Sequence, residues 1–411
     1  MKQKEIELLS SKIKKTTAWK NAEDDYFYVY ADSSLPPQFK ISEPLTNEEI
    51  TNELQKIIDE CPSFYPAYFD LGTRVLSVDM DKATIILDTA FEICIKISSW
   101  NEVSKDFDII FDNFEKSLHE EFTVRYVLKL IDRFPDKAIL YDYVAYAFNV
   151  LGEYAKSIEY QIKAVALEPK NTYFLNNLGV FYLSDKCYSE AEKYFNLSIK
   201  ADPKHENPVN NLADCKTMEK KNLSLKEYYL LPVNYEKIRE YEEKEDYSEL
   251  DSYVSEINNL KLLVFRSSLS ESNQYKVHKF HSLLSTLQVF FGFVKTISND
   301  AFIWEDIDYF CRYFKPIMHK FIFKHGDTDD EILTEIYEST FLYYNFLCKN
   351  NLISNKDFTE FKNHSNSLKN ELFDKMHRYN IIRHDPNISA NKKEKIREEL
   401  FEGDRDWMFI N

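Results

Sequence analysis

Residues 172–203 read TYFLNNLGVFYLSDKCYSEAEKYFNLSIKADP, and residues 138–169 before them read AILYDYVAYAFNVLGEYAKSIEYQIKAVALEP. Small, aromatic and proline positions of the two stretches recur in one register of 34 residues. Apolar residues at spacings of three and four predict two helices in each stretch. Pro135, Pro169 and Pro203 each follow a predicted helix, where the missing N–H prevents the helix from continuing. The period therefore predicts stacked helical hairpins.

Small residues and turn residues indicate how the two helices of each hairpin meet. Ala145 and Gly179 occupy corresponding positions where two helices must approach closely, because a large side chain would hold them apart. Gly152 and the pair Asp185–Lys186 lie between the predicted helices, where the chain must turn.

This register resembles the tetratricopeptide repeat. The matching positions are Leu175, Leu178, Gly179, Tyr182, Tyr188, Ala191, Phe195 and Pro203. The resemblance covers residues 45–222 and is strongest over residues 138–215. It implies an all-α fold, in which an α-solenoid of helical hairpins closes with a more polar last helix near residue 222.

The two ends of the chain lie outside the repeat. Residues 1–44 are predicted to form an N-terminal arm, partly extended, because Tyr26–Tyr30 is aromatic and β-branched as strands are, and Pro36–Pro37 ends it. We recognise no family over residues 223–411 as a whole, and these residues are predicted to form a C-terminal α-helical bundle domain. Its predicted helices lie within residues 235–264, 275–296, 305–324, 329–349, 354–379 and 391–401.

Composition narrows the function classes. The 411 residues suffice for two or three domains, and only 6 glycines nearly exclude glycine-rich phosphate loops. A net charge of -17 disfavours a nucleic-acid partner, because an acidic surface repels phosphate backbones. The 6 cysteines form no Cys-x-x-Cys pair, which favours a reducing cytoplasm. We find no signal-peptide core and no apolar stretch that could span a bilayer, so we expect a cytoplasmic protein without a membrane partner.

The resemblance implies a concave groove lined by the first helix of each hairpin. The expected groove residues are Asp142, Tyr146, Tyr173, Asn176, Asn177, Val180, Asn207, Asn210, Asn211 and Asp214. An asparagine amide both donates and accepts hydrogen bonds, so it can hold a peptide backbone; helix capping or solvation is the alternative role. The family's clamp for C-terminal carboxylates needs lysines and arginine here. With Asp142 and Asp214 at these places, we expect a neutral or basic segment instead.

The leading functional hypothesis is a non-enzymatic adaptor or scaffold that binds a peptide or protein segment in this groove. One alternative is a ribonuclease of a defence or toxin system, regulated by the array, because Arg378 or Arg383 with His384 resembles the arginine–histidine pair of the helical HEPN ribonucleases. The histidine would act as acid or base and the arginine would stabilise phosphate. Tyr379 departs from that family's pattern, and basic residues at a helix C-terminus also explain the motif.

A second alternative is a ligand-responsive sensor or regulatory protein, because the aromatic residues of the C-terminal half permit a small-molecule pocket, although a buried core also explains them. Two sets of residues have the chemistry of metal ligands: His278 with His281, and His319 with His325 and Asp327. Neither set has the glutamate spacing of a metalloprotease. The sequence therefore predicts no metal and no cofactor.

Overall fold

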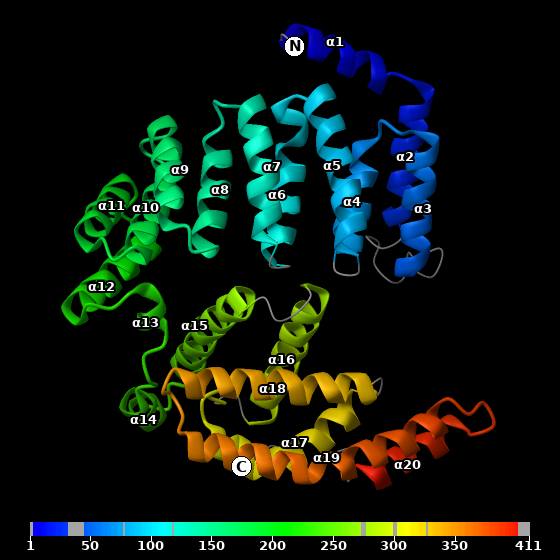
Figure 1. Ribbon diagram of the computed structural model, residues 1–411, viewed down its shortest axis with the longest axis vertical. Coiled ribbons are helices and arrows are strands. Elements are labelled where there is room, and N and C mark those ends of the chain that lie inside the picture. The colour runs from blue at the N-terminus through cyan, green and yellow to red at the C-terminus, as the bar shows by residue number, and fades with distance from the viewer. Residues whose placement is uncertain are drawn as a thin grey trace. The chain divides into compact units, whose positions relative to one another are not determined.

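The chain divides into two units, Met1–Leu225 and Lys226–Asn411 (Figure 1). The computed structural model describes residues 3–31, 45–76, 79–116, 119–272, 277–298, 302–325 and 328–401, and every regular element in these ranges is a helix. The predicted all-α fold is confirmed.

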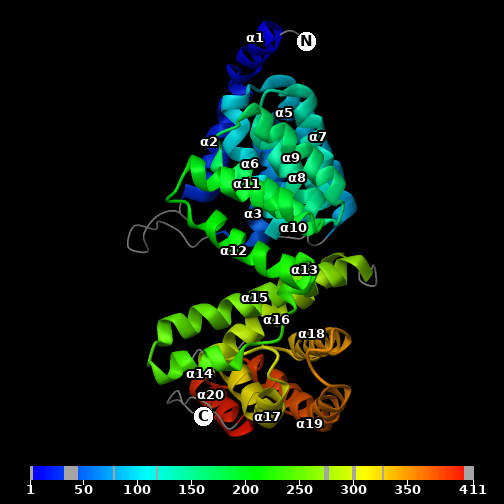
Figure 2. The same ribbon diagram turned by 90° about the vertical axis from the view of Figure 1, so that its left-hand side faces the viewer.

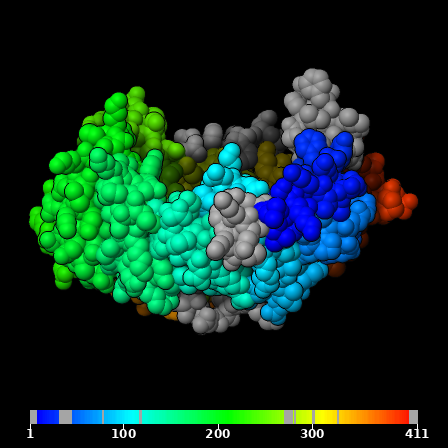
Figure 3. All heavy atoms as spheres, turned by 90° about the horizontal axis from the view of Figure 1, so that it is seen from above, coloured from blue at the N-terminus to red at the C-terminus, as the bar shows by residue number. Residues whose placement is uncertain are grey.

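The first unit is an array of paired helices. They are α1 (Gln3–Lys14), α2 (Thr17–Ala31), α3 (Asn47–Glu60), α4 (Tyr65–Leu76), α5 (Met80–Ile97), α6 (Trp100–Lys116), α7 (Glu120–Arg133), α8 (Ala138–Val150), α9 (Tyr154–Leu167), α10 (Thr172–Ser184), α11 (Tyr188–Ala201) and α12 (Glu206–Lys221). Packing is most extensive within the hairpins α4–α5, α8–α9 and α10–α11. In Figures 1 and 3 the colours of this unit run from blue to green in chain order, so each hairpin lies beside the preceding one. This arrangement is the predicted solenoid.

The residues at the helix ends explain where the helices of the array begin and turn. The side chain of Asn171 caps α10 by accepting hydrogen bonds from the backbone N–H groups of Tyr173 and Phe174. Gly152 and Lys186 adopt positive φ angles of 78° and 57° in the turns inside the two hairpins. The turns therefore lie where the sequence places them.

The small residue at position 179 is required by the approach of α10 to α11. A Cβ atom on Gly179 would lie 2.5 Å from Cε1 of Phe195, a fully buried residue of α11. A Cβ atom on Gly72 of α4 would likewise lie 2.7 Å from the side chain of Leu87 in α5. The prediction that small residues allow close helix approach is confirmed.

The prediction of a strand at Tyr26–Tyr30 is wrong, because these residues belong to α2. Trp19, Ala22 and Val29 are buried, and their spacing is that of one helix face. Tyr26 lies on the same face and contacts Phe64, with ring centroids 5.6 Å apart. The helical period of the buried residues outweighs the short aromatic run. Pro36–Pro37 lies outside the described residues.

The second unit is a helical bundle, as predicted (Figure 2). Following α13 (Leu225–Tyr229), where the two units divide, its helices are α14 (Tyr235–Glu243), α15 (Tyr247–Ser272), α16 (Val277–Ile297), α17 (Ile307–Lys324), α18 (Asp330–Lys349), α19 (Asn355–Arg383) and α20 (Ala390–Leu400). Helix α16 packs on α18, and α19 packs on α17, α18 and α20. Phe291 of α16 stands at the centre of the core, with its ring edge-on to Trp304 at 4.8 Å. Pro316 lies inside α17.

Candidate functional site

Three side-chain hydrogen bonds of one spacing connect the first helices of successive hairpins and the last helix of the array. They run from Tyr143 of α8 to Asp108 of α6, from Asn177 of α10 to Asp142 of α8, and from Asn211 of α12 to Asn176 of α10. Donor and acceptor are 35 residues apart in each, and both asparagine bonds measure 2.9 Å. We call these three bonds the inter-repeat ladder. The ladder directs the amide N–H groups of Asn177 and Asn211 toward the preceding helix.

Asp142 is the most heavily used acceptor of the ladder. Its Oδ1 accepts from Asn177 and also, at 2.7 Å, from Nε2 of Gln161, which is fully buried and donates further to the carbonyl of Phe174. Burial raises the pKa of the Asp142 carboxyl, although the bonds from Asn177 and Gln161 act in the opposite direction. The carboxyl therefore holds two hairpins together at an electrostatic cost.

Asp142→Asn is expected to stabilise the array at neutral pH, because an amide oxygen still accepts both bonds and no charge is buried. Because the pKa of Asp142 is raised, the folded state binds a proton more tightly than the unfolded state does. Proton binding therefore stabilises the fold below pH 3.8, the usual pKa, and this stabilisation is lost as the pH rises through the raised pKa. The advantage of the variant should therefore shrink on acidification. Asp142→Ala should cost about 1–3 kcal/mol, because two donors lose their acceptor. Urea unfolding between pH 4 and pH 7 measures both, and equal stability of the two variants would contradict the assignment.

The remaining groove residues vary in exposure. Tyr173 is 66% exposed and lies beside His205, with ring centroids 4.8 Å apart. Asn207 and Asn210 on α12 are exposed, and Asp214 is half-buried. Accessible polar and aromatic groups therefore follow one another along α10 and α12.

A cavity of about 220 Å³ lies between α6, α7 and α8. Its lining residues are Asp108, Phe111, Asp112, Glu115, Glu120, Thr123, Tyr143, Tyr146 and Ala147. The sequence interpretation places Tyr146 in the groove but misses the acidic residues. Asp108 and Asp112 lie one 34-residue period before Asp142 and Tyr146, so the same register carried one hairpin upstream would have found them.

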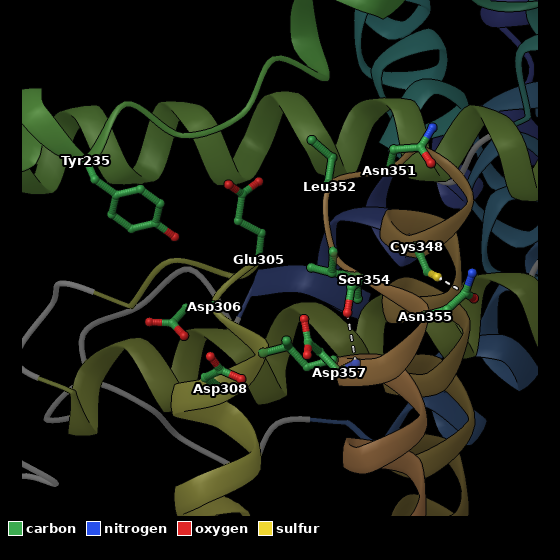
Figure 4. Close-up of a pocket in the computed structure, with 12 residues that line it drawn as sticks. Tyr235, Glu305, Asp306, Asp308, Cys348, Asn351, Leu352, Ser354, Asn355 and Asp357 are labelled. Atoms are coloured by element: carbon green, nitrogen blue, oxygen red, sulfur yellow. Dashed lines mark hydrogen bonds between the residues drawn. The ribbon is translucent and has the colours of Figure 1, made fainter.

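A larger cavity, of about 480 Å³, belongs to the second unit (Figure 4). It is lined by Tyr235, Glu305, Asp306, Ile307, Asp308, Cys348, Asn351, Leu352, Ile353, Ser354, Asn355 and Asp357. Figure 4 shows the hydroxyl of Tyr235 pointing into the space beside Glu305 and Asp306. Burial and these carboxylates raise the pKa of Tyr235 to about 12, so its phenol stays protonated. The cavity has the electrostatic character of a cation site.

A buried ion pair lies at the wall of this larger cavity. Nζ of Lys261 in α15 is 2.8 Å from Oε2 of Glu305, and the two side chains are 1% and 6% exposed. Oε1 of Glu305 accepts a hydrogen bond of 3.0 Å from the backbone N–H of Val233. Glu305 is therefore held in the fold by the ion pair and this hydrogen bond. Asp306 also serves the fold, because its side chain caps α17 by accepting a hydrogen bond of 2.9 Å from the backbone N–H of Tyr309, while Asp308 lines the cavity.

The candidate catalytic residues lie at the C-terminal end of α19. Nε of Arg383 donates to Nε2 of His384 at 3.1 Å, and Nη1 of Arg383 donates to the carbonyl of Thr328 at 2.9 Å. Arg378 is exposed. The structure thus brings Arg383 and His384 together, and the guanidinium also ties α19 to the segment before α18.

The histidine sets with the chemistry of metal ligands are separated or lie outside the described side chains. His319 is buried, with Nε2 3.4 Å from Nζ of Lys375, and His325 stacks on Phe321 at 4.4 Å. The side chains of His278 and His281, and residue Asp327, are not among those described. Within the described part of the chain, no three histidine, cysteine, aspartate or glutamate residues gather as a metal ion requires.

Hydropathy along the helices bears on membrane association. Of the helices within the described ranges, none combines the length and the apolar character that crossing a bilayer requires.

Comparisons with protein families and with solved structures both found similarities. The tetratricopeptide repeat family matches residues 173–205, which span α10 and α11. The chain is similar to the crystal structure of the P58(IPK) TPR domain, with 13% identity over 87% of this chain and 91% of that chain and a TM-score of 0.23. A comparison with curated proteins found no match. Residues 173–205 therefore match a tetratricopeptide repeat, and they lie in an all-α array of helical hairpins in which α8, α10 and α12 begin 34 residues apart.

Proposed function

We propose that the protein is an interaction adaptor whose first-helix face binds a neutral or basic protein segment. Tetratricopeptide repeats generally serve protein interaction, and the match at residues 173–205 supports this role. The observation that carries the proposal is the row of accessible groups formed by Tyr173, Asn207 and Asn210 on successive first helices. Acidic residues continue this row toward α6, which favours a segment without net negative charge.

Two kinds of residue share the groove in this proposal. Tyr146, Tyr173, Asn207, Asn210 and Asp214 are the contact residues for the bound segment. The others hold the hairpins in register through the ladder, and they are Asp142, Asn176, Asn177 and Asn211. A segment lying on the contact residues would meet a surface whose shape the ladder keeps fixed.

Tyr173→Ala is the variant that tests the groove. A display library of short unstructured peptides, selected on the full chain, should yield neutral or basic binders. We expect Tyr173→Ala to raise their Kd about tenfold, because truncating an aromatic anchor of an interface costs about 1–2 kcal/mol. Titration of labelled peptides by fluorescence anisotropy measures the change.

The matched control is Leu197→Ala, which removes an exposed apolar side chain from α11, a second helix of the array. This variant should bind the selected peptides as the unchanged protein does. Acidic binders, or binding that survives Tyr173→Ala and not Leu197→Ala, would contradict the assignment of the face.

The larger cavity favours a second candidate function, a sensor for a small organic cation. Asp306 and Asp308 with Tyr235 would attract an amine, whereas an anion would be repelled. Spermidine at a hundredfold excess over Kd should stabilise the second unit by about 2.7 kcal/mol. Thermal shift measures this, with Asp306→Asn as the comparison variant and glutarate as the anionic control. An equal shift in the variant, or none with spermidine, would remove this candidate.

The ribonuclease hypothesis has the least support. Arg383 already donates to His384 and to a backbone carbonyl, so its guanidinium serves the packing of α19. It stays a hypothesis that His384 and Arg378 act on phosphate.

A further inference from the structure

Helix α12 carries an apolar stripe that is buried at the corresponding positions of α10. Val209 and Ala213 lie 34 residues after Leu175 and Gly179. In α10 both positions are covered: Leu175 is 3% exposed, and Gly179 lies against Phe195 of α11. In α12, by contrast, Val209 is 48% exposed and Ala213 is also exposed. Among the described helices that lie wholly within the first unit, none follows α12, so no second helix of the array covers this stripe (Figure 1).

The stripe is distinct from the other two faces of α12. Cys215 is buried, and its thiol donates to the backbone carbonyl of Tyr188 in α11. At about 100° per residue, Cys215 lies on the opposite side of the helix from Ala213. Asn210, a contact residue of the proposed groove, points about 100° away from its neighbour Val209. One face of α12 therefore packs on the array, a second lines the groove, and the third is open.

Two aromatic pairs show what a second helix places against the end of this stripe. Phe148 of α8 faces Tyr160 of α9, and one period later Tyr182 of α10 faces Tyr194 of α11, with ring centroids 5.6 Å apart in both pairs. Lys216 takes the place of the first-helix ring on α12. It is exposed, and no carboxylate pairs with it within the described part of the chain. A carboxylate at the position of Tyr194 would complement this ammonium group.

The buried residues of the second helices define the rest of the pattern. Each of α9 and α11 carries two small, fully buried residues seven positions apart. These pairs are Ser157 with Ala164, and Ala191 with Ser198. Small residues allow the two helices of a hairpin to approach closely. Between them, Phe195 occupies the space beside Gly179, whereas Ala213 adds a methyl group there, so a helix on α12 needs a side chain smaller than phenylalanine, such as leucine.

We propose that the open stripe of α12 binds an amphipathic helix of a partner protein, which serves as the second helix of an incomplete hairpin. The pattern that fits is small-x-x-Glu-Leu-x-x-small, in which the glutamate pairs with Lys216 and the leucine packs on Ala213. Packing between first and second helices is already the most extensive in the array, so the bound helix continues an existing kind of interface. This proposal does not depend on the groove.

The charge on α12 argues against a second copy of this helix as the occupant. Lys216 and Lys220 are both exposed, and their spacing of four residues places them on the side of the helix that carries the stripe. Two such stripes packed face to face would bring four like charges together, which opposes association. A helix that supplies a carboxylate is therefore the better complement.

The test uses the full chain and a labelled peptide with the sequence of α11, Tyr188–Ala201, with glutamate in place of Tyr194 and leucine in place of Phe195. A crosslink between the exposed positions of Asn196 and Lys200 keeps the peptide helical, because so short a helix is marginal in water. Fluorescence anisotropy should show saturable binding. A second peptide, with lysine in place of Tyr194, should bind at least tenfold more weakly.

Lys216→Glu should reverse the preference, so that the lysine peptide binds more tightly than the glutamate peptide. The matched control is Lys221→Glu, an exposed lysine of the same helix away from the stripe, which should leave the preference as it is. Equal affinities for the two peptides, no reversal in Lys216→Glu, or no binding by the full chain would overturn the proposal.

Tyr173→Ala separates this site from the groove. The variant should bind the glutamate peptide as the unchanged protein does, even where it weakens peptides selected for the groove. Loss of the glutamate peptide in Tyr173→Ala would show that the probe lies in the groove, and the α12 assignment would fail. If no peptide depends on Tyr173 while the preference reverses in Lys216→Glu, the proposed groove fails and the α12 site stands.

Discussion

Lys261→Met is expected to destabilise the second unit by about 3–5 kcal/mol, because it leaves the carboxylate of Glu305 buried without its counter-ion. The pair is 2.8 Å apart and almost completely inaccessible to water. Glu305 cannot swing to solvent without losing its bond to the backbone of Val233. Hydrogen exchange of α15 and α17 in increasing urea measures the loss in this unit separately from the array.

The double variant Lys261→Met with Glu305→Gln is the control. The amide oxygen of glutamine can still accept the bond from Val233, and no charge remains buried, so most of the lost stability should return. Full stability of Lys261→Met alone would show that water or another cation reaches Glu305. A double variant as unstable as the single one would show that packing of the lysine stem, and not its charge, carries the effect.

Gly179→Ala is expected to destabilise the array by about 1–3 kcal/mol, since its Cβ would lie 2.5 Å from the ring of Phe195 in a filled core. The ring must shift, and α10 and α11 must separate. Thermal unfolding followed by circular dichroism, with hydrogen exchange of α10, reports the loss.

Gly292→Ala in α16 is the matched control, because no atom of a neighbouring helix lies within 4 Å of the position that the added methyl group would take. Alanine is preferred over glycine in a helix interior by about 1 kcal/mol, so this variant should be more stable than the unchanged protein. The two substitutions are chemically identical and should have opposite signs. The same sign for both would contradict the close approach of α10 to α11.

The sequence predicts the array because its constraint is local and repeated. A hairpin such as α10–α11 must bring a small residue, Gly179, against a bulky one, Phe195, and the 34-residue register records that requirement. The run Tyr26–Tyr30 carries no such repetition. Its β-branched and aromatic composition favours a strand, and only the more widely spaced Trp19 and Ala22 indicate the helix that forms.

The sites are less accessible to sequence reasoning. The register locates Asn177 on the groove side, but its partner Asp142 follows only from how one hairpin stacks on the next, which offsets the pair by 35 residues. The larger cavity is even harder to predict from the sequence. Tyr235, Glu305 and Asn355 come from segments that share no period, so only the packing of the bundle brings them together.

The inter-repeat ladder gives the array a direction. In the hairpin that begins with α10, adjacent residues face opposite neighbours: Asn176 accepts from Asn211 of α12, and Asn177 donates to Asp142 of the preceding hairpin. A carboxylate such as Asp142 can serve only as acceptor, so reversing a hairpin would place acceptor against acceptor. Asn210 offers the next acceptor position at the end of the series. A designed hairpin with an amide or hydroxyl 35 residues beyond Asn210 would therefore continue the same donor-to-acceptor direction along the array.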